Sequence, residues 1–521
     1  MKRRWLTAIL IAFSLGASQP DVLSGPLVVS DRWPQATNLV AWTRDVMRLE
    51  GLEHATETAQ AKAFFRWLRL FSRMATGGMI QAYEGERGKE TYVTDAHKSL
   101  FVYGWGYCDT TSRIAEAAWA QFKNDSDAAE RVCLQHSSGG YHTMYRLRLD
   151  GRFGAFDPRY GYYLVDRDSS DARILDWAEV GADENITRNK TFHHRSQPFF
   201  EFFGREWTRA LAIQPAYFSS EAAWIKAGSP AESVFGDRKY VPGARYHSMD
   251  FVLPRGASIE RFWSNAERKF YVPAGAHTRK EEAFLPSGRF YRVTESMFNG
   301  NWPKNDPNYA LAQPYLVTVP RDEGYNPGVA GGRTIGQAWG RITWTPRPEE
   351  LGDGLLDLYS PYVLVDATLS GEAIDGARFE VRTLRAKAGD ASEPDYWSEW
   401  ATLRPSPGKF NLKLGTAHGV YRLQVRVDAA KVKGLKLESS FEIGIMSIPR
   451  IFAGSNTVRF LVQDGSALRG TVTVIYRYQT DRGERTYAKV LRAGDFHYGA
   501  ATWQIEAPGL IRCNSVTVKY D

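Results

Sequence analysis

A histidine and an aspartate lie on either side of the strongest turn signal in the sequence. Asp150-Gly151 separates two runs in which apolar and polar residues alternate, as expected for a β-hairpin with a two-residue turn. Counting outward from that turn, Met144 faces Asp157, and His142 is the diagonal neighbour of Asp157 on the same face. Diagonal pairs lie about 7–8 Å apart between backbone positions, close enough for an imidazole and a carboxylate to meet. The pair therefore has the composition of an oriented general base.

Cys108 supplies a nucleophile that such a base would activate. It follows Gly104-Trp105-Gly106-Tyr107 and precedes a helical pattern over residues 109–122. The N–H groups and the dipole of a helix N-terminus stabilise a thiolate, which lowers the thiol pKa from about 8.5 toward neutrality. The glycines would let a substrate carbonyl approach the backbone, and the Cys108 amide would help to bind an oxyanion. Together these groups have the chemistry for acyl transfer through a thioester.

The elements that must position these residues form an α+β pattern. Residues 56–76 carry apolar side chains at three- and four-residue spacing, which predicts a helix that ends before Gly77-Gly78. A second helix is predicted from Cys108 to about Phe122. Helices followed by a small antiparallel sheet indicate an α+β core. The strands predicted for that sheet are 141–149, 152–156 and 160–165.

The order of these motifs along the chain resembles the transglutaminase-like superfamily. In that family a Gly-x-Cys opens a helix, a His follows on a strand, and an Asp, often before Pro, follows on the next strand. Gly106-Tyr107-Cys108, His142 and Phe156-Asp157-Pro158 match this order, and Arg131-Val132 lies where the family has an Ala-Arg or Cys-Arg pair. The resemblance covers residues 50–170. It implies a papain/transglutaminase-like fold and a Cys-His-Asp triad that needs no cofactor or metal.

Two departures from the family pattern bear on the reaction. Asp109 follows the Cys where cross-linking transglutaminases have Trp, and their calcium-binding extensions are not recognisable. Amide hydrolysis is therefore favoured over cross-linking. A further oxyanion or substrate-binding donor is expected upstream of Cys108, and the candidates are Trp105 and Tyr103.

Other residues offer weaker alternatives. Cys108 would be a small buried apolar residue if the site were not catalytic. Cys133 and Cys513 lie on predicted strands and are expected in the core. His136 lies in a Ser-Ser-Gly-Gly loop with no carboxylate in register. The adjacent His193-His194 would point to opposite faces of a strand, so no metal site is predicted there.

The N-terminus has the pattern of a cleaved export signal. Basic residues 2–4 precede an apolar stretch, 5–15, and small residues follow at 16–18, which predicts a signal peptide over 1–18 and a periplasmic or secreted protein. An uncleaved anchor is the alternative. No later segment is apolar enough for a membrane helix. Three cysteines cannot form a disulfide framework in a chain of 521 residues.

Three further regions follow the signal. A transglutaminase-like catalytic domain is predicted for residues 35–203 and a β-rich connecting region for 204–346. Short alternating runs separated by turn signals predict one or two antiparallel β-sandwiches over 347–521. The clearest runs are 362–365, 377–382, 420–427, 439–445, 457–462 and 471–478.

The composition narrows the partners. The formal charge is +7, but the basic residues are dispersed, which disfavours nucleic acid. The expected substrate is a protein, a peptide or a peptide-bearing cell-envelope polymer. The alternative is a non-catalytic extracellular binding protein, in which Trp397 and Trp400 either stack on carbohydrate or fill the core.

Overall fold

The computed structural model is built mainly of β-strands, with helices concentrated in the N-terminal part. The predicted signal peptide and most of the predicted connecting region lie outside the residues that it describes. The described residues are 21–74, 82–85, 91–106, 108–135, 141–157, 162–163, 165–166, 172–182, 246–263, 269, 271, 284–285, 289–290, 316–318, 333–335, 338–347, 351, 354–385, 395–465 and 468–521. None of the helices within these ranges has the length and apolar character needed to cross a bilayer.

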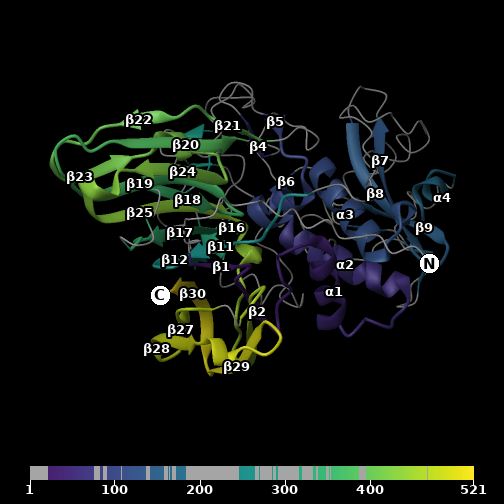
Figure 1. Cartoon of the computed structure of the whole chain (residues 1–521). Helices are drawn as coiled ribbons and strands as arrows, with labels where there is room; N and C mark the ends of the chain where they lie inside the picture. Colours follow the sequence, from purple (N-terminus) through teal and green to yellow (C-terminus); the bar gives the residue numbers. More distant parts are fainter. Residues whose placement is uncertain are drawn as a thin grey trace, which may run out of the picture.

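The helices lie together on one side of the molecule (Figure 1). Rings from α2 and α3 form their shared core, with Phe64 packing against Trp119 at 5.3 Å between centroids. Asn38 and Thr56 cap the first two helices by accepting hydrogen bonds from the backbone N–H groups of Ala41 and Ala59. The helical segments are α1 Leu39–Leu49, α2 Glu57–Phe71, the π-helical η1 Lys98–Tyr103, α3 Cys108–Lys123, η2 Ser126–Ala128, α4 Trp177–Ala182, η6 Gly415–Ala417, η7 Ala429–Lys431, η8 Ile445–Ser447 and η9 Ala493–Asp495.

The prediction of a helix beginning at Cys108 is confirmed by α3, whereas the first predicted helix is too long. The α2 helix ends at Phe71, because Ser72 is extended with a ψ of 103°. Beyond it, β3 (Arg73–Met74) pairs in parallel with β6 (Trp105–Gly106), the strand that leads into α3. The prediction that this helix reaches residue 76 is therefore wrong, since residues 73–74 pair with a second chain segment.

A four-stranded antiparallel sheet follows the helices, as predicted. Its order is β10-β9-β8-β7, with β7 Ala129–Gln135, β8 Tyr141–Leu149, β9 Arg152–Asp157 and β10 Tyr162–Tyr163. Leu149 pairs with Arg152 across the turn, and Asp150 and Gly151 have φ values of 51° and 84°. Positive φ at both turn positions matches the twist of a β-hairpin, so the predicted two-residue hairpin is confirmed.

Aromatic rings join the hairpin to the helices. Tyr145 stacks on Phe156 at 5.3 Å between centroids, and Phe65 of α2 lies 5.3 Å from the same Phe156 ring. All three residues are almost fully buried. The hairpin is therefore fixed against α2 by one face, the face that carries Tyr145 and Phe156.

The C-terminal part is a β-sandwich whose strands match the predicted runs. Phe379 of the five-stranded sheet packs on Phe410 of the eight-stranded sheet at 5.2 Å between centroids. The eight-stranded antiparallel sheet has the order β23 Gly408–Lys413, β19 Val363–Ala373, β25 Val432–Ile443, β17 Ala338–Trp344, β12 Ala257–Phe262, β30 Leu510–Tyr520, β27 Val472–Thr480 and β28 Gly483–Leu491. The five-stranded sheet has the order β18 Leu355–Tyr359, β24 Arg422–Val427, β20 Phe379–Arg385 and β21 Tyr396–Trp397, with β22 Ala401–Leu403 also on β20.

Segments distant in sequence complete these sheets. The central strands β12 and β17 come from the predicted connecting region, so the large sheet extends across the predicted boundary at residue 347. A three-stranded sheet joins β2 Leu27–Ser30 to β26 Gly454–Leu461 and β29 Ala500–Ala507. The remaining pairs are β1 Val22–Ser24 with β11 Val252–Pro254, β4 Tyr83–Glu84 with β5 Thr91–Tyr92, β13 Phe284–Leu285 with β14 Arg289–Phe290, and β15 Leu316–Thr318 with β16 Arg333–Ile335.

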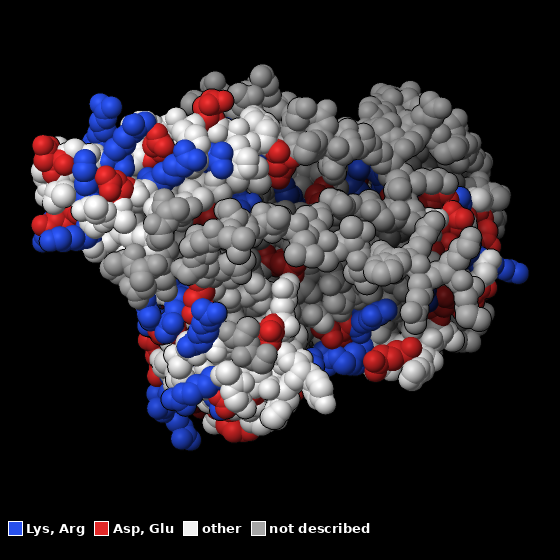
Figure 2. Space-filling view, viewed as in Figure 1, with Lys and Arg blue, Asp and Glu red and all other residues white. Residues whose placement is uncertain are grey.

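Charged side chains of both signs alternate over the described surface. On the face drawn in Figure 2, Lys and Arg are interspersed with Asp and Glu over the sandwich and the helical part. A mixed surface of this kind lacks the single-sign field that attracts a polyanion.

Candidate active site

Cys108 is the first residue of α3, so its backbone N–H belongs to the turn that has no intrahelical acceptors. The entry to this helix requires glycine at position 106. A Cβ atom there would lie 2.5 Å from the Cβ of Thr110, in the first turn of α3. The Gly-x-Cys spacing therefore has a steric cause, because the strand β6 passes directly over the start of the helix.

Replacing Gly106 by Ala is expected to destabilise the protein by about 1–3 kcal/mol, the usual range for overpacking a tight contact. The matched control is Gly415→Ala, because a Cβ at Gly415 would have no neighbour within 4 Å. Denaturant unfolding of both variants measures the difference. Equal stabilities for the two variants would show that the contact with Thr110 relaxes freely.

A buried ion-pair network holds the first two turns of α3 against β7. Arg131 donates from Nη1 to Asp109 Oδ1 at 3.0 Å and from Nε to Glu116 Oε2 at 2.7 Å. Arg113 donates to the other oxygen of Asp109, Oδ2, at 3.0 Å. Burial raises the pKa of Glu116 even though Arg131 opposes that effect. Burial by itself would lower the pKa of Arg131, but the two carboxylates outweigh it and raise that pKa. Asp109, the residue that follows Cys108, is thus part of this network.

Hydroxyl groups connect the same helix to its other neighbours. Ser112, one turn after Cys108, donates from Oγ to the Thr143 carbonyl oxygen of β8 at 3.3 Å. The hydroxyls of Thr111 and Ser72 share a hydrogen bond of 3.0 Å. The Cys108 helix therefore packs on the strand that carries His142, next to position 143.

The hairpin register relates the positions of His142 and Asp157. The ladder between β8 and β9 pairs Tyr145 with Phe156. Continued by one residue, this register would set Met144 opposite Asp157 and the strand position of His142 diagonal to it, so the relation between positions 142 and 157 stays a prediction. Asp157 is fully buried at the end of β9. The backbone of His142 lies in β8, opposite Leu134, and its side chain lies outside the described residues.

The exposure of the thiol sets a limit on its chemistry. Cys108 is 4% exposed. Only a small part of this residue meets solvent, so a large flat surface could not engage the sulfur. Cys513 is also buried, and its Sγ lies 3.4 Å from the Ile451 carbonyl oxygen, which agrees with its predicted place in the core.

The remaining predicted residues separate into three groups. Tyr103, at the end of η1, donates its hydroxyl proton to Glu84 Oε1 at 2.7 Å. This hydroxyl is therefore not available as a donor to an oxyanion at Cys108 while that hydrogen bond is present. Trp105 lies in β6, and its side chain lies outside the described residues, as do the side chain of Cys133 and all of His136 and His193-His194. Within the described ranges, no group of three or more potential ligands could hold a metal ion.

The two tryptophans of the sandwich are stacked with arginines. The guanidinium carbon of Arg382 lies 4.5 Å from the Trp397 ring centroid and 4.4 Å from that of Trp400. Arg422 lies over Trp397 at 5.4 Å, and Arg426 lies over Trp400 at 4.1 Å. Both indoles are half-buried. A sugar stacking on these rings would compete with guanidinium groups already in cation–π contact.

A buried polar cluster joins the helical part to the sandwich, and sequence reasoning did not find it. The Glu84 carboxylate accepts hydrogen bonds from the hydroxyls of Tyr103 and Tyr421 and pairs with Lys98 Nζ at 2.6 Å. Lys98 Nζ also lies 4.2 Å from the centroid of the Tyr421 ring. Tyr421 lies 337 positions from Glu84 in sequence, so no local pattern could reveal their contact.

His247 borders this cluster and is held in the neutral form. Its backbone N–H donates to Asp95 Oδ2 at 2.6 Å, and its ring Nε2 donates to the Pro361 carbonyl oxygen at 2.7 Å. Burial, and then the positive charge of Lys98, lower the pKa of His247 to about 4. Since the unfolded chain would have a His pKa of about 6.5, the unfolded state binds the proton first.

Stability is therefore expected to fall as the pH drops from 6.5 to 4, with no further loss from this group below pH 4. His247→Gln keeps a donor near Pro361 and cannot titrate, so it should flatten this part of the pH profile. Urea unfolding at half-unit pH steps measures the effect, with the exposed His418→Gln as the control. A His247→Gln profile parallel to that of the wild type would contradict the assignment.

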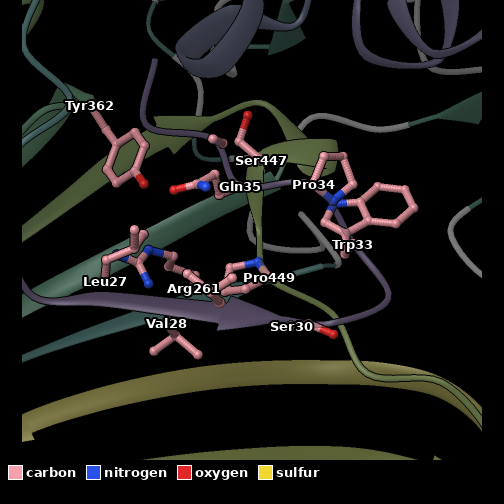
Figure 3. Close-up of a pocket in the computed structure, with 12 residues that line it drawn as sticks. Leu27, Val28, Ser30, Trp33, Pro34, Gln35, Arg261, Tyr362, Ser447 and Pro449 are labelled. Atoms are coloured by element: carbon pink, nitrogen blue, oxygen red, sulfur yellow. The ribbon is translucent and has the colours of Figure 1, made fainter. Parts of the chain in front are cut away.

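A cavity of about 20 Å³ lies apart from Cys108 and Asp157. It opens between the segment 27–36, Arg261 of β12, Tyr362 and the region of η8 (Figure 3). Neither Cys108 nor Asp157 lines this cavity. The cavity is therefore a different site from the one that Cys108 and Asp157 would form.

Comparison with known proteins identifies no family. No family model and no curated protein matches this chain. One solved structure with partial similarity is described as a beta-galactosidase from Bacteroides fragilis, with 14% identity, a TM-score of 0.09 and 38% of this chain covered. Another is the pilus backbone from Streptococcus pneumoniae, with 10% identity, a TM-score of 0.09, and 35% of this chain and 71% of that chain covered. The chain spans only 30% of the first of these proteins. Scores this low carry no argument about fold or function.

Proposed function

We propose that this protein is an exported, transglutaminase-like cysteine enzyme that hydrolyses amide bonds in a protein, a peptide or a peptide-bearing cell-envelope polymer. Its catalytic part would have a papain/transglutaminase-like core, with Cys108, His142 and Asp157 as the triad. The observation that carries the proposal is the position of Cys108 as the first residue of a helix packed on β8. The hairpin formed by β8 and β9 carries positions 142 and 157, and its register, continued past Tyr145 and Phe156, would set these two positions on the diagonal.

In the proposed reaction His142 takes the proton of the Cys108 thiol. The thiolate attacks the amide carbonyl carbon, and the negative charge moves to the carbonyl oxygen, where the Cys108 N–H stabilises it. The C–N bond then breaks, His142 returns the proton to the leaving amine, and a thioester remains. Water, deprotonated by His142, attacks the thioester to release the acid and restore the thiol. Asp157 would fix the imidazole tautomer and stabilise its charged form.

The burial of Cys108 and Asp157 supports a narrow site. Solvent exclusion strengthens the interaction between an imidazolium ion and a carboxylate, because the local dielectric is low. It also selects slender acyl groups, such as an extended peptide side chain or terminus. Trp105 would lie beside the entry to α3 as a substrate contact, whereas Tyr103 would have to release Glu84 before it could donate to an oxyanion.

The acyl-enzyme is the intermediate that tests the proposal. Incubation with the small activated ester p-nitrophenyl acetate should give a burst of p-nitrophenolate and a thioester located on Cys108 by peptide mass spectrometry. Hydroxylamine at neutral pH should remove the acetyl group. Cys513→Ser is the matched control and should retain the burst, because that buried thiol lies in the C-terminal sheet. Acetylation confined to lysines, or spread equally over the cysteines, would rule out the proposed nucleophile.

The alternative, a glycan-binding protein without catalysis, has less support. Its main sequence feature was the pair Trp397 and Trp400, and arginines now stack on both rings. No observation on the described residues favours a sugar over these arginines.

A further inference from the structure

Arg261 is a buried cation without a protein counter-charge. The residue is 5% exposed, and its Nε makes no hydrogen bond. Within the described part of the chain, Arg261 forms no ion pair, and its one aromatic contact is with the Tyr362 ring at 5.7 Å from the centroid. A guanidinium stays protonated at every pH at which proteins fold, so it cannot escape burial by losing its charge.

The nearest acidic residue in sequence is committed elsewhere. Glu260, the preceding residue on β12, accepts from Arg477 at Oε1 and from Arg341 at Oε2, each at 3.0 Å. Successive residues on a strand point to opposite faces, so Glu260 and Arg261 leave the sheet on different sides. Arg261 therefore has no carboxylate from its own strand.

The cavity described above places other polar groups around this guanidinium. Arg261, Gln35, Tyr362 and Ser447 all line it, and in Figure 3 Gln35 lies between Arg261 and Ser447, whose hydroxyl points away from Arg261. Arg261 is therefore the charged group of this lining, and a buried charge normally has a protein or solvent partner.

We infer that this cavity binds a small monovalent anion of the size of chloride. An anion would neutralise Arg261, whose burial without a counter-charge is otherwise costly. A water-sized occupant needs roughly 10–15 Å³. The cavity volume of about 20 Å³ therefore leaves room for a small ion beside Arg261.

The position of the cavity gives the anion a structural consequence. Its walls come from the segment that enters the helical part, from the centre of the large sheet, and from η8 after β25. Trp33, on the same wall, already donates from Nε1 to the Met446 carbonyl oxygen at 2.8 Å. A bound anion would therefore tie the helical part to the sandwich at their junction.

The experiment compares thermal unfolding of the full-length protein in sodium chloride and in sodium gluconate at equal ionic strength. Chloride is expected to raise the wild-type midpoint saturably by about 2–4 °C, because it binds the folded state alone. Arg261→Met should remove this dependence. Arg341→Met removes an arginine from the adjacent strand β17 and should behave as the wild type.

Bromide provides a direct test that does not depend on the folding of any variant. Crystals grown in bromide should show an anomalous peak in the cavity beside Arg261. A cavity that holds only water in such crystals would overturn the inference, as would an Arg261→Met variant with the wild-type chloride dependence.

Discussion

Replacing Arg131 by Met is expected to lower the free energy of unfolding by about 3–5 kcal/mol. The reason is that Glu116 would remain buried without its cation, and Asp109 would keep only its pair with Arg113. Their side chains are only 5% exposed, so water cannot replace the lost partner. Denaturant unfolding, followed by near-UV circular dichroism, measures the loss.

Arg146→Met is the matched control for this variant. Arg146 lies on β8 of the same sheet and pairs with Glu130 and Asp176, but its side chain is 27% exposed. Pairs that water can reach contribute about 0–1 kcal/mol. The double variant Arg131→Met, Glu116→Gln should recover part of the loss, because Asp109 keeps its ion pair with Arg113 and the buried carboxyl at position 116 no longer carries a charge. Equal destabilisation by Arg131→Met and Arg146→Met would refute the buried-network account.

Replacing Cys108 by Ser is expected to lower the rate of amide or ester hydrolysis by about 10³-fold or more. A hydroxyl is a much weaker nucleophile than a thiolate in a site arranged for sulfur, and loss of the nucleophile removes the contribution of the whole triad. Burst and steady-state rates with p-nitrophenyl acetate, and then with a panel of peptide amides, measure the effect.

Asp157→Asn distinguishes catalysis from packing in this experiment. The amide has the same shape, so the fold should persist, but it favours the wrong imidazole tautomer and should lower the rate by about 10⁴-fold. Cys513→Ser should keep the wild-type rate. If Cys108→Ser keeps the wild-type rate as well, the triad is not the source of any activity observed.

The hairpin and the start of α3 could be predicted because local sequence determines both. Asp150-Gly151 accepts the positive φ values of a tight turn, and alternation on either side fixes which residues face each other. Likewise, Gly106 before Cys108 reflects a contact within four residues of chain. The prediction of a diagonal relation between positions 142 and 157 rests on these local facts alone.

The contacts between distant segments could not be predicted in this way. Strand β2 pairs with β26 more than 400 residues later, and β12 lies between β17 and β30 in the large sheet. The alternation of residues in one strand predicts that a strand forms, but it does not predict which distant strand it pairs with. That choice depends on the topology of the whole chain. For the same reason the sequence did not predict the Glu84 cluster or the burial of Arg261, because the residues around each come from several distant parts of the chain.

The rate at which iodoacetamide alkylates Cys108, measured across pH by peptide-resolved mass spectrometry, tests the central claim most directly. Burial slows alkylation at every pH and by itself moves the midpoint of the profile upward, whereas a neighbouring imidazolium and a helix N-terminus move it downward. We expect a midpoint well below the value of about 8.5 for an ordinary cysteine, and a return toward that value in His142→Gln. A wild-type midpoint at or above 8.5 would contradict the account, because Cys108 would then be an inert core thiol.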